Sequence, residues 1–195
     1  MIALVDYDAG NIKSVANALE RLGAGYELTA DPERIRAASK VILPGVGNAA
    51  EAMESLRSKG LAELIRGLRK PVLGICVGMQ IMCRRSEEGD ASCLGLFDCD
   101  VVRFAPEEGV KVPHMGWNSI SNLESKLFKG LDEGSFVYFV HSYRPGLCTD
   151  TIATCRHGSE LFSAALKYEN FYGTQFHPEK SGTVGETILK NFLAL

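Results

Sequence analysis

A short apolar segment that runs into a glycine-flanked cysteine constrains this chain more than any other feature. Residues 71–73 lead directly into Gly74-Ile75-Cys76-Val77-Gly78. Glycines two positions before and two positions after a nucleophile let a strand and the following helix approach closely, as a sharp strand-to-helix turn requires. The segment therefore predicts a nucleophile elbow, in which the side chain of Cys76 is presented above a sheet.

The predicted position of Cys76 also favours its reactivity. A helix N-terminus stabilises the thiolate, the form of cysteine that attacks a carbonyl carbon. The backbone N–H of Val77 would then face the developing oxyanion. An isolated cysteine is more often a buried core residue, but the two flanking glycines favour the catalytic interpretation.

The first half of the chain alternates apolar strands with amphipathic helices. We expect strands at 1–7, 40–43 and 71–75, and helices at 11–22, 48–57 and 61–68. This rhythm indicates right-handed crossovers and a parallel sheet covered on both faces. The predicted fold class is therefore α/β, with a doubly wound, mainly parallel sheet flanked by helices.

The second half is richer in β structure. Strands are expected at 101–104, 117–121, 136–140, 151–155, 162–168 and 171–176, and a helix at 186–195 closes the chain. No internal repeat or Pro/Ser-rich linker interrupts the sequence. Residues 1–195 are therefore expected to form a single domain, with extra β strands in its second half.

Composition excludes several classes of function. The formal net charge is -3 and no basic tract is present, which argues against nucleic acid as the main partner. No apolar run approaches the ~20 residues of a membrane span. No signal peptide is recognised at the start of the sequence, so we expect a cytoplasmic protein that does not act at a membrane.

The six cysteines do not suggest a metal centre. They include no C-x-x-C pair, and no histidine lies at zinc-ligand spacing from two of them. We therefore expect no metal and reduced thiols. Cys83, Cys99 and Cys155 have apolar neighbours and are expected in the core.

A second glycine-rich segment, Gly45-Val46-Gly47-Asn48-Ala49-Ala50, matches a dinucleotide-binding pattern. Pro44 precedes it on an internal strand, and no acidic residue closes a strand about 20 residues later, which disfavours a nucleotide site. Loops at the carboxyl ends of parallel strands lie at one edge of a sheet. We therefore expect the backbone of Gly45, Val46 and Gly47 to supply oxyanion donors beside the elbow.

His177 is the best candidate for the base that serves Cys76. It follows a predicted strand and precedes Pro178 and Glu179. Residues two apart in an extended segment point the same way, so Glu179 can orient the imidazole and stabilise its charged form. By itself this segment is an ordinary polar turn, and it becomes a catalytic candidate only together with the elbow.

The other three histidines are weaker candidates. His157 is expected in a polar turn and His114 in a loop after Pro113. His141 ends a strong predicted strand, where a pocket-lining role and a half-buried structural role are equally favoured.

With these residues placed, the sequence resembles the class I glutamine amidotransferases, which carry G-x-C-x-G-x-Q and a late H-P-E. The likeness runs along the whole chain. Within that family, several further motifs resemble the subunits that serve imidazole glycerol phosphate synthases. These motifs are Asp6-Tyr7 with Gly10-Asn11, Pro44-Gly45-Val46-Gly47, Pro113-His114-Met115-Gly116-Trp117-Asn118, Tyr138-Phe139-Val140-His141-Ser142-Tyr143 and Gln175-Phe176-His177-Pro178-Glu179-Lys180-Ser181.

The resemblance implies a flavodoxin-like fold and hydrolysis of L-glutamine without a cofactor. Cys76 would form a glutamyl thioester, His177 would transfer protons and Glu179 would orient His177. The ammonia would pass to a separate cyclase subunit with a (β/α)8 barrel, forming a heterodimer. The cyclase subunit would combine this ammonia with the formimino ribonucleotide PRFAR, giving imidazole glycerol phosphate and AICAR in histidine biosynthesis.

Further roles follow only from the resemblance. Gln80, Glu88 and the backbone of Ser142 and Tyr143 would hold the amino-acid end of glutamine, with Glu88 at its α-amino group. The segment 44–47 and Val77 would supply oxyanion donors, and a rearrangement of that segment is a plausible gate that the cyclase controls. Asn11, Trp117 and Lys180 match positions that face the cyclase, although a core position for Trp117 is equally favoured. Asp8 stands where relatives more often carry glycine.

Other functions remain open from the sequence. A glutaminase subunit of another synthase, such as one making pyridoxal 5'-phosphate, would share the triad and lack the 113–118 motif. A stand-alone thiol hydrolase or peptidase on a similar fold would need no partner. A non-catalytic binding module would have lost the triad geometry, which the presence of all three residues disfavours.

Overall fold

The central sheet explains how the elbow is positioned. A computed structural model describes residues 1–8 and 10–195. Its seven-stranded sheet has the order β11-β12-β13-β4-β3-β1-β2. Strands β13, β4, β3, β1 and β2 pair in parallel, and β12 and β11 extend the sheet through antiparallel pairings. The strands are β1 (Ile2–Val5), β2 (Tyr26–Thr29), β3 (Lys40–Leu43), β4 (Val72–Ile75), β11 (Thr151–His157), β12 (Glu160–Tyr168) and β13 (Phe171–Thr174).

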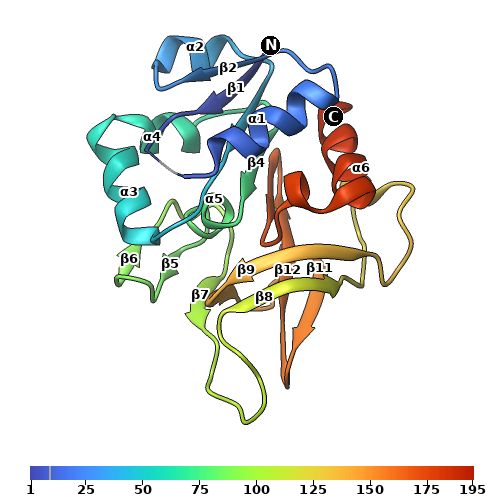
Figure 1. The fold of residues 1–195 in the computed structure, drawn as a ribbon. Coiled ribbons are helices and arrows are strands. Elements are labelled where there is room, and N and C mark those ends of the chain that lie inside the picture. The colour runs from blue at the N-terminus through green and yellow to red at the C-terminus, as the bar shows by residue number, and fades with distance from the viewer. Residues whose placement is uncertain (9) are drawn as a thin grey trace.

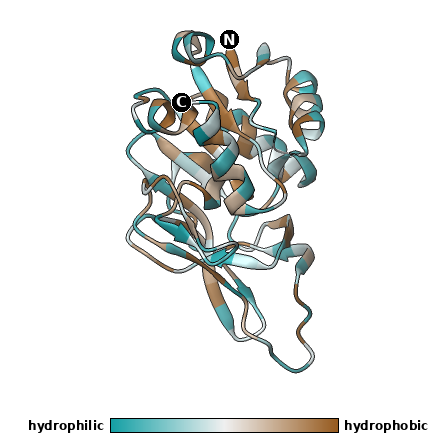
Figure 2. Cartoon of the chain, turned by 90° about the vertical axis from the view of Figure 1, so that its left-hand side faces the viewer, coloured by the Kyte–Doolittle hydropathy of each residue, from teal (hydrophilic) through white to brown (hydrophobic). Residues whose placement is uncertain are grey.

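Helices cover both faces of this sheet (Figure 1). They are α1 (Ile12–Arg21), α2 (Pro32–Ala37), α3 (Ala49–Ser58), α4 (Leu61–Arg66), α5 (Val77–Gln80) and α6 (Gly182–Leu193). Helices α1 and α6 lie together on one side, where Arg21 and Glu186 form an ion pair of 3.5 Å, and α3 and α4 lie on the other. The parallel strands are largely apolar, whereas the helices mix hydrophobic and hydrophilic residues (Figure 2). The predicted α/β class is confirmed.

Local sequence explains where the helices begin. Asn48 accepts hydrogen bonds from the backbone N–H groups of Ala50 and Glu51 and so caps α3. Asp31 caps α2 in the same way, and Pro32 occupies the first turn, where its missing N–H has no consequence. These caps place α3 immediately after the glycine-rich segment at the end of β3.

Two smaller sheets lie beside the carboxyl ends of the parallel strands. One has the order β10-β7-β5-β6 and the other pairs β8 with β9. Their strands are β5 (Arg85–Ser86), β6 (Ala91–Ser92), β7 (Asp100–Arg103), β8 (His114–Ser119), β9 (Phe136–His141) and β10 (Tyr143–Pro145), and the 3-10 helices are η1 (Lys126–Phe128) and η2 (Pro178–Lys180). The β8–β9 ribbon crosses below α5 and α6 in Figure 1.

The structure corrects some predicted boundaries. Strand β8 begins at His114 rather than at Trp117, so the expectation that His114 lies in a loop is wrong. Its alternation places His114 inside and Met115 outside, because the strand pairs along its whole length with β9. Helix α6 begins at Gly182, four residues before the predicted start. Strand β2 was not predicted, since only Thr29 in it is buried and its alternation is weak.

The expected core cysteines are confirmed, because Cys83, Cys99 and Cys155 are all buried. Nearly all of the buried apolar residues form one cluster that extends from Ile2 to Phe192. None of the helices in residues 1–8 and 10–195 combines the length and apolar character that a bilayer span demands.

Candidate active site

Cys76 occupies a strained turn between β4 and α5. Its φ of 53° and ψ of -111° lie outside the regions that L-residues ordinarily adopt. Surrounding hydrogen bonds hold this conformation: the Cys76 N–H donates to the Thr174 carbonyl at 2.7 Å, and the Cys76 carbonyl accepts from Met79 and Gln80 at 3.0 Å each. Such strain persists only where neighbouring structure enforces it, and it clusters at functional sites.

The two glycines of the elbow are sterically required. A Cβ added to Gly74 would lie 2.5 Å from the Gly78 carbonyl oxygen. A Cβ added to Gly78 would lie 2.0 Å from the Leu43 carbonyl oxygen. Helix α5 therefore packs directly on the backbone of β3 and β4, and this contact raises Cys76 above the edge of the sheet.

His177 and Glu179 form a buried pair beside the elbow. Nδ1 of His177 lies 2.8 Å from Oε1 of Glu179, and both side chains are fully buried. The backbone at His177 is fixed twice, since its N–H donates to Tyr138 and its carbonyl accepts from the Ser181 hydroxyl. Nε2 of His177 has no hydrogen-bond partner among the described residues, so it is available to Cys76.

Charges around His177 favour the imidazolium. Burial alone would lower the pKa of His177, but the Cys76 thiolate and the Glu179 carboxylate outweigh it and raise this pKa above its ordinary value. His177 can therefore hold a proton that a leaving group can take.

Two residues that contact the triad were not assigned to it from the sequence. The Asn11 amide donates to Oε1 of Glu179 and lies 3.5 Å from Nδ1 of His177. Gln175 donates from Nε2 to the Cys76 sulfur at 3.6 Å and accepts from Gln80 at 2.9 Å. The position of Gln175, two residues before His177 on an extended segment, is the one sequence signal that pointed to it.

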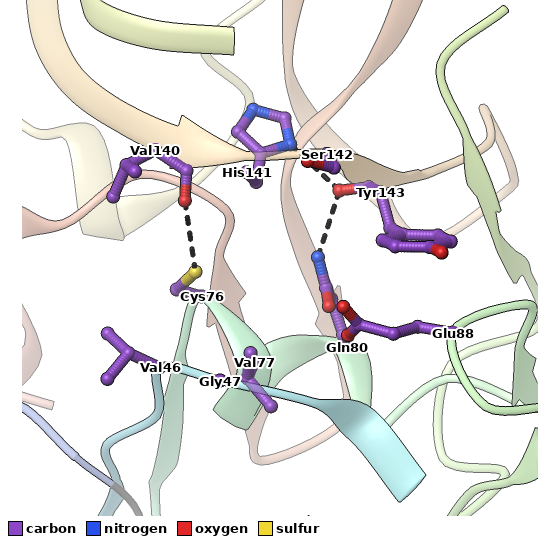
Figure 3. Close-up of a pocket in the computed structure, with 10 residues that line it drawn as sticks. All are labelled: Val46, Gly47, Cys76, Val77, Gln80, Glu88, Val140, His141, Ser142 and Tyr143. Atoms are coloured by element: carbon purple, nitrogen blue, oxygen red, sulfur yellow. Dashed lines mark hydrogen bonds between the residues drawn. The ribbon is translucent and has the colours of Figure 1, made fainter. Parts of the chain in front are cut away.

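A cavity of about 230 Å³ opens beside Cys76 (Figure 3). It is lined by Val46, Gly47, Cys76, Val77, Gln80, Glu88, Val140, His141, Ser142 and Tyr143. The structure thus brings nearly all of the expected substrate-binding residues to one pocket, and His141 lines it too, which confirms the pocket-lining role among its two predicted roles. Gly45 is absent from this lining because it packs against the backbone of Gly78.

Polar groups converge on the end of this cavity away from Cys76. Nε2 of Gln80 donates to the Tyr143 carbonyl at 3.0 Å. Oε2 of Glu88 accepts from the Ala49 N–H at 3.0 Å, at the start of α3. Partial burial raises the pKa of Glu88, and the Ala49 N–H opposes that rise. Figure 3 shows Glu88 beside Gln80, facing Tyr143.

The glycine-rich segment 44–47 forms another wall. The Tyr7 hydroxyl, which is buried, donates to the Pro44 carbonyl. Gly47 has a φ of 110°, a conformation that favours glycine. A Cβ added to Gly45 would lie 2.6 Å from the Gly78 nitrogen, so the segment rests against the elbow itself.

The residues expected at a partner face lie on one side of the site. Trp117 is 55% exposed, so the alternative of a core position for it is wrong. Lys180 is exposed, whereas Asn11 is partly buried because its side chain contacts the triad. Asp8 is exposed and forms an ion pair of 3.0 Å with Lys59.

Comparisons with known proteins agree with this geometry. The family model described as glutamine amidotransferase class-I matches residues 3–195. A Bacteroides thetaiotaomicron protein named "Imidazole glycerol phosphate synthase subunit HisH" is 56% identical over 195 residues, covering 100% of this chain and 99% of the relative. A Shewanella loihica protein of the same name is 48% identical, covering 98% of this chain and 89% of the relative.

Solved structures share the fold at low identity. A crystal structure titled as a glutamine amidotransferase superposes with a TM-score of 0.76 at 19% identity, covering 100% of this chain and 98% of the other. A putative GMP synthase component from Thermoplasma acidophilum superposes with a TM-score of 0.70 at 23% identity, covering 99% of this chain and 92% of the other.

Proposed function

This chain belongs to the class I glutamine amidotransferase family, and on that premise we propose that it is the glutaminase subunit of an imidazole glycerol phosphate synthase. The observation that carries the proposal is the Cys76 elbow, which lines a polar-ended cavity and interacts with the buried His177–Glu179 pair. The names of the relatives at 56% and 48% identity support the choice of synthase.

The chemistry follows from the triad. The Cys76 thiolate attacks the carboxamide carbon of glutamine, and the electron pair of the carbonyl moves onto oxygen. His177 gives its proton to the leaving nitrogen, so that ammonia departs and a glutamyl thioester remains. His177 then takes a proton from water, the resulting hydroxide attacks the thioester, and glutamate leaves as the Cys76 sulfur is released. Glu179 keeps the imidazole oriented throughout.

The backbone supplies the oxyanion donors. Val77 at the start of α5 lines the cavity beside Cys76, as do Val46 and Gly47 of the segment 44–47, and their backbone N–H groups are the proposed donors. Donors aimed at the developing negative charge contribute most where water is excluded. We infer that the segment 44–47 reorients to complete this set, with Gly45 and Gly47 absorbing the change in backbone angles. If backbone exchange of residues 45–47 were identical with and without the liganded partner, the gate would lie elsewhere.

The other end of the cavity fits the amino-acid end of glutamine. Glu88 offers a carboxylate to the α-amino group, while Gln80 and the backbone of Ser142 and Tyr143 face the α-carboxylate. The cavity of about 230 Å³ suits a small amino acid.

The ammonia would pass to a cyclase subunit with a (β/α)8 barrel, with which this chain forms a heterodimer. There it would react with the formimino ribonucleotide PRFAR to give imidazole glycerol phosphate and AICAR in histidine biosynthesis. Trp117 and Lys180 are exposed on one side of the site and Asn11 reaches the triad from it, so we propose that this side faces the cyclase.

The test is glutamate release from L-glutamine by the chain alone, then with the cognate cyclase and its ribonucleotide. We expect low activity alone, a strong rise in the ternary mixture and no activity in Cys76→Ala. Full activity without a partner would favour a stand-alone thiol hydrolase. No rise with the cyclase, but a rise with the partner of a pyridoxal 5'-phosphate synthase, would identify another synthase. No activity with either would favour a non-catalytic module.

A further inference from the structure

Three histidines outside the triad gather where β8, β9 and β11 meet. His114 and His141 are 4% and 6% exposed, and His114 Nδ1 lies 3.0 Å from His141 Nε2. His157 stacks on His114 with ring centroids 4.1 Å apart. The catalytic steps described above use none of these imidazoles.

The direction of the hydrogen bonds is determined at the Tyr143 end. His141 Nδ1 lies 2.8 Å from the Tyr143 carbonyl oxygen, and a carbonyl can only accept. The proton of His141 is therefore on Nδ1. Burial lowers the pKa of His141 to about 3, so the ring is neutral at neutral pH and its Nε2 accepts. The donor to that nitrogen is Nδ1–H of His114.

At the other end of this series of hydrogen bonds, Asn118 determines independently which atoms donate and which accept. Its Oδ1 accepts from the Ser119 N–H at 2.8 Å, and its Nδ2 donates to the Arg156 carbonyl at 2.9 Å. These two backbone groups set the orientation of the amide, so the second Nδ2 hydrogen points to His114 Nε2 at 3.1 Å. Burial, with a smaller contribution from His157, lowers the pKa of His114 to about 4, in agreement with a neutral, accepting Nε2.

We propose that this hydrogen-bond chain, from Asn118 through His114 to His141, positions the Tyr143 carbonyl and with it the backbone wall of the substrate pocket. Tyr143 O also accepts from Gln80 Nε2 at 3.0 Å, so two donors fix the orientation of its peptide group. The inference rests on the proposed function, because that function assigns the Ser142–Tyr143 backbone to the amino-acid end of glutamine. His114 and His141 are thus positioning residues.

A packing role alone predicts a different result. His114 stacks on Phe139, with centroids 4.7 Å apart, as well as on His157. Phenylalanine at position 114 would preserve this stacking and remove both hydrogen bonds of the ring. His157 is the matched control. It belongs to the same stack, but its Nε2 donates to the Lys111 carbonyl, which is not part of the hydrogen-bond chain.

The kinetic test compares His114→Phe, His114→Gln and His157→Phe in the complex with the cyclase. We expect His114→Phe to raise KM for glutamine about fivefold with kcat within about twofold, since one positioning hydrogen bond contributes modestly. His114→Gln, whose amide can both donate and accept, should restore much of the wild-type KM. An unchanged KM in His114→Phe, or an equal rise in His157→Phe, would overturn the proposal.

A spectroscopic test does not depend on activity. In 15N-histidine-labelled protein, which has four histidines, His114 and His141 should both be protonated on Nδ1 with unprotonated Nε2. In His114→Phe the Nε2 signal of His141 should move to the position of a nitrogen that accepts no hydrogen bond. An Nε2–H tautomer at either residue would rule out the proposed hydrogen-bond chain. A wild-type complex without glutaminase activity would instead refute the proposed function. The nitrogen signals would still show whether the hydrogen-bond chain from Asn118 to His141 exists.

Discussion

The side-chain amide of Asn11 donates a hydrogen bond to Oε1 of Glu179, across 168 positions of sequence. Asn11 adopts a left-handed conformation with φ of 67° at the residue before α1, which turns its side chain toward the triad. The same carboxylate oxygen accepts from His177. The orientation of the imidazole therefore depends on a residue at the start of the chain, on the side that we assign to the partner.

This contact predicts the effect of Asn11→Ala. Without the amide, His177 is the one side chain among the described residues that bonds to Glu179, and kcat for glutamine hydrolysis in the complex should fall about tenfold, the loss of one hydrogen bond to a charged group. Lys13→Ala, an exposed change in the first turn of α1, should leave kcat unchanged. The affinity for the cyclase is measured in parallel by titration. A loss of activity that saturating cyclase restores would show that Asn11 acts on association and not on the triad.

The elbow predicts a large difference between two glycine substitutions. Gly78→Ala should lower the free energy of unfolding by about 3 kcal/mol, because the new Cβ would meet the Leu43 carbonyl in a close-packed contact. Gly146→Ala, whose Cβ would meet no atom of the described residues within 4 Å beyond its chain neighbours, should change it by less than about 0.5 kcal/mol. Urea unfolding of both variants is the measurement, and equal stabilities would contradict the packing described for α5.

The hydroxyl of Tyr7 predicts a further effect on segment 44–47. Tyr7→Phe would leave the buried Pro44 carbonyl without this donor and should lower the free energy of unfolding by about 1–2 kcal/mol. Hydrogen exchange of the Val46 and Gly47 amides should become faster. Tyr26→Phe is the control, since the Tyr26 hydroxyl donates to exposed Glu20. Unaltered exchange at Val46 and Gly47 would show that Tyr7 does not hold the segment.

The buried histidines predict how stability depends on pH. In the folded chain the pKa values of His114 and His141 are lowered to about 4 and about 3, against 6.5 for the ordinary residue. Between pH 6.5 and about 4 the unfolded state therefore binds more protons than the folded state. The stability that depends on these two histidines should be full above pH 6.5 and should fall as the pH drops, by about 1 kcal/mol per pH unit for each histidine.

Urea unfolding between pH 7 and 5 checks this prediction. The double variant His114→Gln/His141→Gln should show a flatter profile than the wild type, whereas His157→Gln should keep the wild-type slope. His157 and His177 are further titratable neighbours of His141, and the double variant retains both of them. Parallel profiles for the wild type and the double variant would refute the assignment of these pKa shifts.

Much of the fold was predictable because its signals are local. The apolar run before Gly74, the spacing of the glycines around Cys76 and the two-residue interval between His177 and Glu179 are properties of adjacent residues. Strand β2 escaped prediction because an edge strand with one buried residue carries little pattern. His114 was assigned to a loop because its strand becomes visible only when it pairs with β9.

The sequence by itself determined the alternation of strands and helices, the elbow and the choice of three candidate triad residues, since each depends on spacing within a few positions. Only the tertiary structure decided that Asn11 reaches Glu179, that Tyr7 bonds to Pro44 and that a hydrogen-bond chain ends on the Tyr143 carbonyl. The order of strands in the sheet and the pairing of β8 with β9 bring these distant residues together. These contacts depend on how the whole chain packs, and a local sequence pattern does not predict them.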